Sequence, residues 1–233
     1  MRRIAIISVH GCPMASLGGK DTGGMSVYVH QLARGLGQLG LNVEVYTRAH
    51  ASRDSSIISL HDNAHVVHIP AGPADASKEA IPIHLDTFLS GVRAFRQEHG
   101  LNYDLIHSHY WLSGWVADTL AKEWSIPHVA TFHTLAEIKR RARVGEREPD
   151  LRVRAEHRVT ASADKIVVST THEEQAVQRL YHVAKDKIDV ISPGVDLSTF
   201  HPGSRRDARE KLGLNGDRTL LYVGRLEPIK GLE

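Results

Sequence analysis

The stretch IAIISV at residues 4–9 is a run of apolar and small residues, and His10 follows it directly. Its length and its β-branched side chains predict a strand buried on both faces. A glycine-rich loop follows up to Gly24. Apolar residues then recur at helical spacing from Met25 to Leu39, and Gly40 suits the left-handed position that ends a helix. A strand, a long loop and a helix in this order predict the first half of a β–α–β unit.

The same alternation of short β-branched runs and helical patterns continues along the chain. Amphipathic spacing predicts helices over residues 85–95 and 111–124, and Thr171 with Glu174 predicts a capping box that opens another. We therefore expect an α/β fold: a Rossmann-like, doubly wound parallel sheet that binds its ligand beyond the carboxyl ends of the strands. The further strands are expected at residues 43–47, 65–69, 105–107, 128–132, 165–169 and 188–191.

The pattern changes near the end of the chain. Residues 192–196 and 201–203 are rich in proline and glycine, which is typical of a connector. A new strand is expected at residues 219–223, followed by a loop that leads toward the helix of another unit. We expect residues 1–202 to form the sheet domain. Residues 203–233 are then a connector with the first strand and loop of a second, truncated domain.

Composition narrows the classes of function. Lys and Arg number 29 and Asp and Glu 27, so the net charge of +2 is too balanced for a dedicated nucleic-acid or membrane-surface protein. Hydrophobic residues make up 41%, which excludes a disordered chain. The only cysteine is Cys12, which predicts neither an internal disulfide nor a thiolate metal cluster and fits the cytoplasm. No apolar run approaches the ~18 residues of a membrane span.

One dinucleotide-binding motif is present in the wrong place. GLGQLG at residues 35–40 matches GxGxxG, but it lies at the end of a predicted helix and no acidic residue follows the next strand. A nicotinamide-dependent dehydrogenase is therefore the weakest interpretation. The stretch GMSVY at 24–28 lacks the final glycine of a nucleophile elbow, so Ser26 is not expected to be a nucleophile.

Side chains and N–H groups that bind oxygen gather where the first predicted strand ends. His10 follows that strand directly, facing the expected cleft. The glycines of the next loop allow close approach of a phosphate or sugar oxygen to a helix N-terminus. A tight turn capped by Asp21 or Thr22 is the alternative. The loop residues concerned are Asp21, Thr22, Gly23, Gly24, Met25 and Ser26.

Two further strand ends carry similar chemistry. His107 and His109 share one face of a strand and could bind a metal, but no third ligand stands at a suitable spacing. The preferred interpretation is that one histidine bonds the backbone and that the Tyr110 hydroxyl binds a ligand. After the next strand, His133 stands near Lys139, which suits an oxyanion or a sugar hydroxyl; a buried histidine bonded to backbone is the alternative.

Basic residues follow these strand ends. The basic runs at 139–143 and 152–154 are separated by acidic residues. In one interpretation these basic residues form a solvated surface. In the other they surround a phosphate group of the ligand. Near the end of the chain, Arg225 and Lys230 stand five residues apart in a loop bounded by glycines. They could neutralise a diphosphate leaving group, or form an ordinary exposed loop.

Together these motifs resemble glycosyltransferase family 4, whose members have the two-domain GT-B fold. The resemblance implies that this chain is the N-terminal, acceptor-binding domain with the opening of the nucleotide-sugar-binding domain. Within the family it extends to members that use inositol phosphate and then to sucrose-phosphate synthases. The motifs are the Gly-Gly-Met loop, HSHYWLSG at 107–114, HTLA at 133–136 with Lys139, SPGVD at 192–196 and GRLEPIKG at 224–231.

The resemblance also implies roles for individual residues. It assigns the acceptor phosphate to Lys78, Tyr110, Thr134 and Arg152, with Arg154 as the alternative to Arg152. It places the inositol ring against the loop at 21–26, with His10 lining the same cleft and Gly24 also near the donor. The implied catalytic residues are His133 at the transferred sugar, and Arg225 and Lys230 at the donor diphosphate.

We therefore expect a retaining glycosyltransferase that moves a hexosyl group from a nucleotide diphosphate sugar, best a UDP-sugar, to a phosphorylated polyol or sugar. No metal or other cofactor is expected in this chain, and a homodimer stays open. The chain alone is expected to be nearly inactive, because the resemblance places half of the donor site beyond it. The alternatives are an unphosphorylated glycan or lipid acceptor, and a non-catalytic phosphosugar-binding module.

Overall fold

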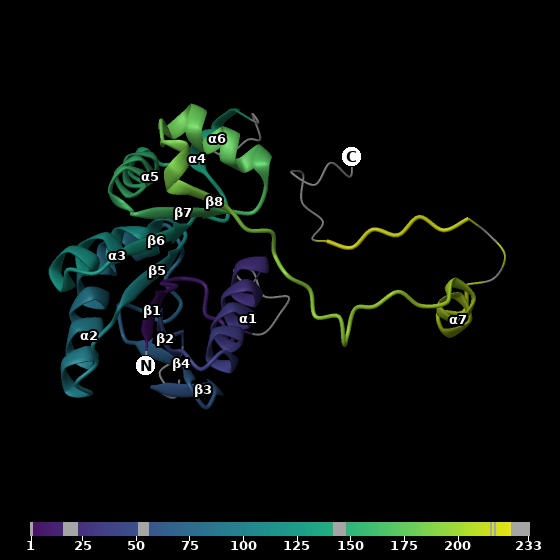
Figure 1. Cartoon of the computed structure of the whole chain (residues 1–233), viewed down its shortest axis with the longest axis horizontal. Coiled ribbons are helices and arrows are strands. Elements are labelled where there is room, and N and C mark those ends of the chain that lie inside the picture. The colour runs from purple at the N-terminus through teal and green to yellow at the C-terminus, as the bar shows by residue number, and fades with distance from the viewer. Residues whose placement is uncertain are drawn as a thin grey trace. The chain divides into compact units, whose positions relative to one another are not determined.

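The computed structural model describes residues 2–15, 23–50, 56–141, 148–214, 216 and 218–224. The chain divides into two compact units, Met1–Ser192 and Pro193–Glu233. Each unit is considered by itself below, with its elements labelled as in Figure 1.

The first unit is built on an eight-stranded sheet in the order β3-β4-β2-β1-β5-β6-β7-β8. All neighbouring strands pair in parallel except β3, which runs antiparallel to β4 at one edge. The predicted doubly wound parallel sheet is thus confirmed, and the antiparallel edge strand is an addition to it. The strands are β1 (Arg3–Ile7), β2 (Asn42–Arg48), β3 (Ile57–His61), β4 (Ala64–Ile69), β5 (Leu105–His109), β6 (His128–Thr131), β7 (Lys165–Val168) and β8 (Ile188–Val190).

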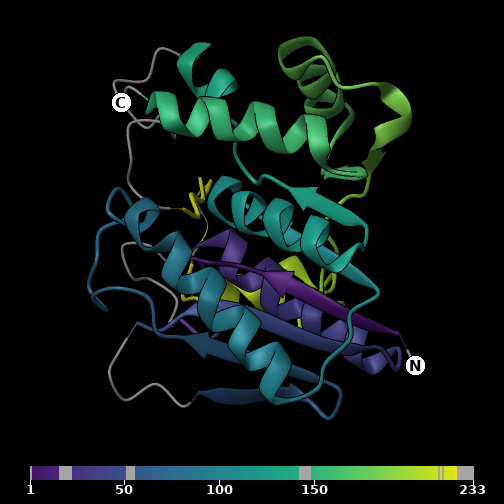
Figure 2. The same ribbon diagram turned by 90° about the vertical axis from the view of Figure 1, so that its left-hand side faces the viewer.

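Helices cover both faces of this sheet, with α1 on one side and α2 and α3 on the other (Figures 1 and 2). The first strand shows why: Ile4 and Ile6 pack with α1 residues, whereas Ala5 and Ile7 belong to the cluster that includes α2 and α3. Both faces of β1 are therefore buried, as its apolar run predicts. The helices are α1 (Gly24–Gln38), α2 (Leu85–Glu98), α3 (Trp111–Trp124), α4 (Ala136–Arg141), α5 (Asp150–Ser162) and α6 (Thr171–Tyr181), with the 3-10 turns η1 (Ile81–His84) and η2 (Lys185–Lys187).

Helices α3 and α5 approach each other closely at a glycine. A Cβ atom on Gly114 would lie 2.9 Å from Cγ1 of Val159, closer than real Cβ contacts allow. Beside this contact, the buried carboxylate of Asp118 bonds Arg158 across the helix pair and Lys122 along its own helix. The two helices are thus fixed to one another by a close contact and by charge.

Two local expectations need correction, and helix α5 is an addition to them. The capping box is one residue earlier than predicted: Thr170 Oγ1 accepts from Glu173 N at 3.1 Å, and Glu173 accepts from Ser169 N at 2.9 Å, so Thr171 already lies inside α6. The expected strand at residues 219–223 is not formed by those residues, each of which is exposed. Helix α5 is an addition to the predicted elements, because its buried face includes the charged residues Arg152 and Glu156 and so lacks an apolar pattern.

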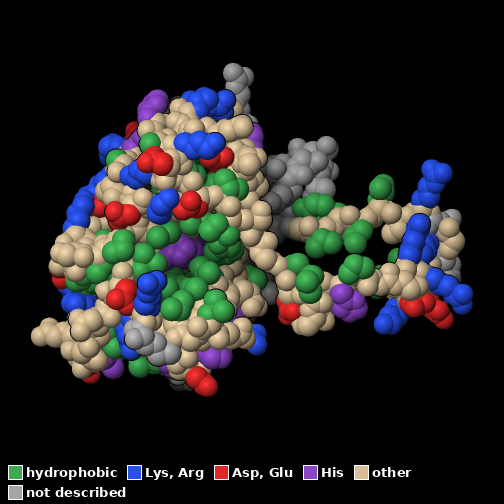
Figure 3. Space-filling model, viewed as in Figure 1, with side chains coloured by type: hydrophobic (Ala, Val, Ile, Leu, Met, Phe, Trp, Pro, Cys, Tyr) green, Lys and Arg blue, Asp and Glu red, His purple; other side chains and the backbone are tan. Residues whose placement is uncertain are grey.

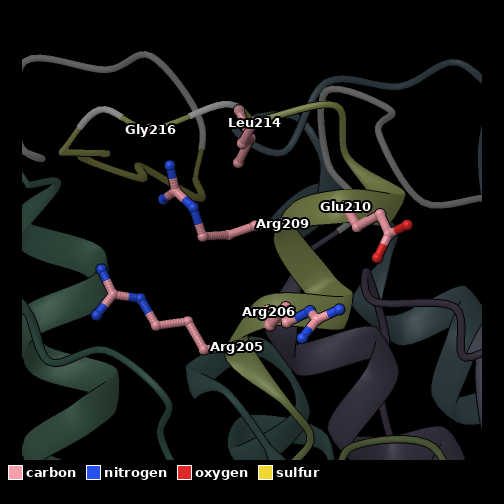
Figure 4. Close-up of a pocket in the computed structure, with 6 residues that line it drawn as sticks. All are labelled: Arg205, Arg206, Arg209, Glu210, Leu214 and Gly216. Carbon is pink, nitrogen blue, oxygen red and sulfur yellow. The ribbon is translucent and has the colours of Figure 1, made fainter.

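The second unit contains α7 (Arg205–Lys211), which is capped by Ser204 through a 3.3 Å hydrogen bond from Asp207 N. A hollow of about 600 Å³ lies beside α7. In Figure 4, Arg205 and Arg209 extend to the same side of the helix and Arg206 extends away. The guanidinium groups therefore do not converge on one point.

None of the helices in the described residues is both long enough and apolar enough to span a bilayer.

The contact between α3 and α5 can be tested with two glycine variants. Gly114→Val should lower the free energy of unfolding by about 1–3 kcal/mol, because the added methyl groups overlap Val159 in a packed interior. Gly35→Val is the matched control, since Gly35 is also helical but a Cβ there meets nothing within 4 Å. Its expected change is within about 0.5 kcal/mol. Urea denaturation measures both, and equal effects would contradict the packing argument.

Candidate functional site

The candidate site lies where the winding direction of the sheet reverses. From β1 the chain builds outward through β2 and β4, then crosses by α2 to β5 on the other side of β1. Loops that leave the carboxyl ends of β1 and β5 therefore diverge, which opens a crevice. His10 follows β1 and Tyr110 follows β5 there, and His133 follows the neighbouring strand β6.

The backbone is strained at two of these strand ends. Tyr110 has φ 76° and ψ 161°, and His133 has φ 61°, a region that non-glycine residues avoid. Tyr110 is held there by hydrogen bonds from its N–H to Thr131 O at 2.8 Å and from Gly114 N to its own carbonyl at 2.9 Å. Such strain on neighbouring strands is typical of a site that fixes side-chain positions.

Cations and an imidazole surround the Tyr110 ring. Lys78 Nζ lies 4.4 Å from the ring centroid, and the guanidinium carbon of Arg152 lies 4.9 Å from it. The His10 ring is tilted against it with centroids 4.5 Å apart. Lys78 forms no ion pair with any residue that the structure describes. Its ammonium group is therefore available to an anionic ligand.

Arg152 is held by a buried network that spans three helices. Its Nε donates to Glu156 and its Nη1 to Glu148, each at 2.7 Å. Its Nη2 donates to the carbonyl and hydroxyl oxygens of Thr134 at 2.9 and 3.0 Å. Burial acts to lower the pKa of Arg152, but Glu156, Tyr110 and Glu148 outweigh it and raise that pKa. Arg152 is thus a cation on α5 that is fixed beside Thr134, the residue three positions after the end of β6.

A cavity of about 400 Å³ lies beside this network. Lys139 reaches it and forms an ion pair with Glu148 at 2.5 Å. Apolar surfaces of Trp111 and Leu151 complete a hollow that offers cations, a phenol and a hydrophobic wall. The lining residues are Lys78, Glu79, Pro82, Tyr110, Trp111, Lys139, Glu148, Pro149, Leu151 and Arg152.

Histidines form a connected group at the ends of β5 and β6. His109 Nδ1 and His133 Nε2 are 2.9 Å apart, and the His107 ring is tilted against that of His109 with centroids 4.3 Å apart. His107 also bonds Thr131 Oγ1 at 3.0 Å. Tyr28 from α1 closes the group with its ring 5.2 Å from that of His133. Figure 3 shows a histidine side chain at the surface of this unit, encircled by hydrophobic side chains.

Burial keeps these histidines neutral. It lowers the pKa of His107 to about 3 and that of His133 to about 4, and it lowers the pKa of His109. The pKa of His10 is also lowered, by burial and then by the charge of Lys78. The imidazoles therefore donate and accept hydrogen bonds at neutral pH and do not act as cations. Among the described residues, no three His, Cys, Asp or Glu side chains are arranged to hold a metal ion.

The structure brings five of the predicted residues together. His10, Lys78, Tyr110 and Arg152 share one cluster, and Thr134 joins it through Arg152. Arg154 is exposed and does not line the cavity. Gly23, Gly24, Met25 and Ser26 form the N-cap and first turn of α1. Asp21, Thr22, Arg225 and Lys230 lie outside the described residues.

Several residues of the site were missed. Glu148 and Glu156 were not predicted as partners of Arg152, although their spacing of four residues on either side of it is a signal for helical ion pairs. Arg48, at the end of β2, donates to the carbonyls of Pro73 and Ala74 and so supports the loop that carries Lys78. No local pattern points to Arg48, because its partners are backbone atoms of a distant loop.

Comparisons with known proteins find relatives over most of this chain. The family model Glycosyltransferase Family 4 matches residues 22–199. The D-inositol 3-phosphate glycosyltransferase of Saccharomonospora viridis is 45% identical over 98% of this chain and 54% of its own length. Sucrose-phosphate synthase from Thermosynechococcus elongatus is 31% identical, with a TM-score of 0.83 over 92% of this chain and 53% of that one.

A more distant structure, Anabaena HepE in complex with UDP and glucose, is 16% identical with a TM-score of 0.67 over 100% of this chain and 56% of that chain, and shows the fold alone. This chain spans about half the length of the curated relatives it matches.

The neutral histidines make stability depend on pH. The pKa of His133 is about 4 in the fold, below its unfolded value of about 6.5. The unfolded chain therefore takes up protons first as the pH falls. The stabilising contribution is complete above about pH 7 and is lost between about pH 6.5 and 4.

The variant His133→Asn should reduce the slope of unfolding free energy against pH in that window by up to about 1.4 kcal/mol per pH unit. Asparagine tolerates the left-handed backbone of this position, so the variant should fold. Urea unfolding at several pH values between 4 and 8 measures the slope. His99→Asn is the control, since it makes the same substitution at a histidine that is exposed at the C-terminal end of α2. An unchanged slope in His133→Asn would refute the argument.

Proposed function

Because the chain belongs to glycosyltransferase family 4, we propose that it binds the acceptor in a retaining hexosyl transfer from a nucleotide diphosphate sugar to a phosphorylated polyol or sugar. The activity belongs to the whole protein, since this chain corresponds to about half of its relatives. The proposed acceptor is an inositol phosphate or a molecule like it. A cytoplasmic setting is proposed with it, in keeping with the single, buried Cys12.

One observation carries the phosphate part of the proposal. Lys78, Lys139 and Arg152 line the same cavity as the phenol of Tyr110, at the carboxyl end of the sheet. A phosphate monoester has about two negative charges and oxygens that accept several hydrogen bonds. Ammonium and guanidinium groups with an adjacent hydroxyl are the donors that such a group requires. A neutral polyol would need no such concentration of cations.

The rest of the acceptor would lie toward the histidines. His10 contacts Tyr110 and has a buried Nδ1 that no described residue bonds. It could therefore bond a hydroxyl of the acceptor ring. Gly23 to Ser26 lie at the start of α1, whose N–H groups favour oxygen ligands. The acceptor is thus proposed to run from the phosphate cavity to the N-terminus of α1.

The proposed reaction needs no metal in this chain. The acceptor hydroxyl attacks the anomeric carbon on the face from which the diphosphate leaves, so a new glycosidic C–O bond forms as the bond to the diphosphate breaks. The hydroxyl proton passes to an oxygen of the departing diphosphate. His133, neutral and fixed by His109, would hydrogen-bond the transferred sugar. Holding both substrates in this arrangement can lower the barrier by up to about 7–11 kcal/mol.

The donor side of the site is proposed on sequence resemblance. A UDP-sugar is the proposed donor, with Gly24 close to it. Arg225 and Lys230 would stabilise the negative charge that develops on the diphosphate. Both residues lie outside the described part of the chain, so their roles depend on the motif GRLEPIKG at 224–231.

Acceptor binding can be tested on this chain by isothermal titration calorimetry. Inositol 3-phosphate should bind, and unphosphorylated inositol should bind at least about tenfold more weakly. Lys78→Ala should weaken inositol 3-phosphate binding by about 10- to 100-fold, the cost of one hydrogen bond to a charged group. Arg154→Ala is the matched control: it removes an exposed cation near the cavity and should change the affinity less than about twofold.

Equal affinity for the phosphorylated and unphosphorylated compounds would overturn the phosphate site. It would favour transfer to a glycan or lipid acceptor without phosphate. Equal losses in the two variants would mean that general charge, and not the position of Lys78, governs binding.

A further inference from the structure

The two carboxylates that flank Arg152 are held in different ways. Glu156 is fully buried and accepts from Ala136 N at 2.8 Å, from the Tyr181 hydroxyl and from Arg152 Nε. Three elements thus fix it. Glu148 lines the cavity, and its carboxylate accepts from two long cationic side chains, Lys139 and Arg152.

Glu148 is the anion that two of the cavity cations, Lys139 and Arg152, bind in this structure. One of its oxygens bonds Lys139 Nζ and the other bonds Arg152 Nη1. Burial acts to raise the pKa of Glu148, but these two partners outweigh it and hold that pKa below its ordinary value. Its carboxylate is therefore charged at neutral pH, and two cations that face the cavity are already paired with it.

A bound phosphate would compete for the same donors. Nη2 of Arg152 is used by Thr134 and Nε by Glu156, so Nη1 is the part of the guanidinium that faces Glu148. A phosphate that bonds Nη1 and Lys139 Nζ would place about two negative charges against the Glu148 carboxylate. Like charges at this distance in a partly buried site repel strongly.

We propose that Glu148 determines acceptor specificity by acting as an internal anion that a phosphorylated acceptor must displace from Lys139 and Arg152. This rests on the proposed function, because it assumes that the cavity takes the acceptor phosphate. A neutral polyol cannot replace a carboxylate on two cations, whereas a phosphate with about two charges can. A neutral polyol therefore leaves Glu148 on both cations and gains no bond from them, whereas a phosphate gains both donors at the cost of displacing Glu148.

The position of Glu148 suits this exchange. It precedes Pro149, the N-cap of α5, and so lies outside the helix that holds Arg152 and Glu156. Its side chain can turn away while the Arg152–Glu156 pair remains intact. Arg152 therefore stays in place through Glu156 and Thr134 after Glu148 has left.

The test compares the affinities of three proteins for inositol 3-phosphate and for inorganic phosphate. Trp111 lines the cavity, so its fluorescence reports binding, and calorimetry provides a second measurement. Glu148→Gln keeps the shape of the side chain and removes its charge, and should bind both compounds about tenfold more tightly than the unaltered chain. Asp150→Asn removes the same charge two residues away, on a side chain that is 79% exposed and paired with Arg140. It should change the affinity less than about twofold.

The outcomes separate the two proposals. Tighter binding by Glu148→Gln, without tighter binding by Asp150→Asn, supports the role of Glu148. This holds also if the unaltered chain binds too weakly to measure. Unchanged or weaker binding by this variant, with measurable binding by the unaltered chain, overturns that role and leaves the phosphate site standing. Binding by neither protein overturns the phosphate site and the Glu148 proposal with it.

Circular dichroism checks that Glu148→Gln folds. If it does not fold, Glu148→Asp serves instead: it keeps the charge but shortens the reach to the two cations, and should also bind more tightly. Weaker binding by Glu148→Asp than by the unaltered chain would count against the proposal.

Discussion

The ion pair between Arg152 and Glu156 is the interaction on which the site depends. Removing two charges from water costs several kcal/mol per ion unless further hydrogen bonds satisfy them. Here those bonds come from the start of α4, from the Tyr181 hydroxyl on α6 and from Thr134 after β6. Each of these segments must keep its place for the pair to be stable. The buried charges therefore fix the relative positions of the helices that surround the cavity.

A second constraint follows from the way the strands end. The carboxyl ends of β5 and β6 carry Tyr110 and His133 in backbone conformations that cost free energy. The cost is met because the side chains are held from several directions, Tyr110 by Lys78, Arg152 and His10, and His133 by His109. The phenol and the imidazole are thus positioned before any ligand binds, which reduces the entropic cost of binding.

The regular parts of the fold could be predicted from sequence because they follow from periodicity. Helix α3 spans residues 111–124 as expected, and the run predicted as a strand at residues 4–9 overlaps β1 (Arg3–Ile7). The placement of His10, Tyr110 and His133 at one edge followed from parallel strands alone. Helix α5 could not be predicted in the same way, because its buried face includes Arg152 and Glu156, which look like surface residues in a sequence. Partners such as Arg48 and Tyr181 act through backbone atoms or across long separations, and no local pattern encodes them.

The close contact of Gly114 with Val159 has a consequence for the geometry of the cavity. Gly114 lies one helical turn after Tyr110 on α3, and Val159 lies two turns after Arg152 on α5. The distance between the two helices at this contact therefore affects the distance between the Tyr110 phenol and the Arg152 guanidinium. A larger side chain at position 114 would push the helices apart and so change the distance between these two groups. The width of the cavity thus depends on a helix–helix contact that lies outside its lining.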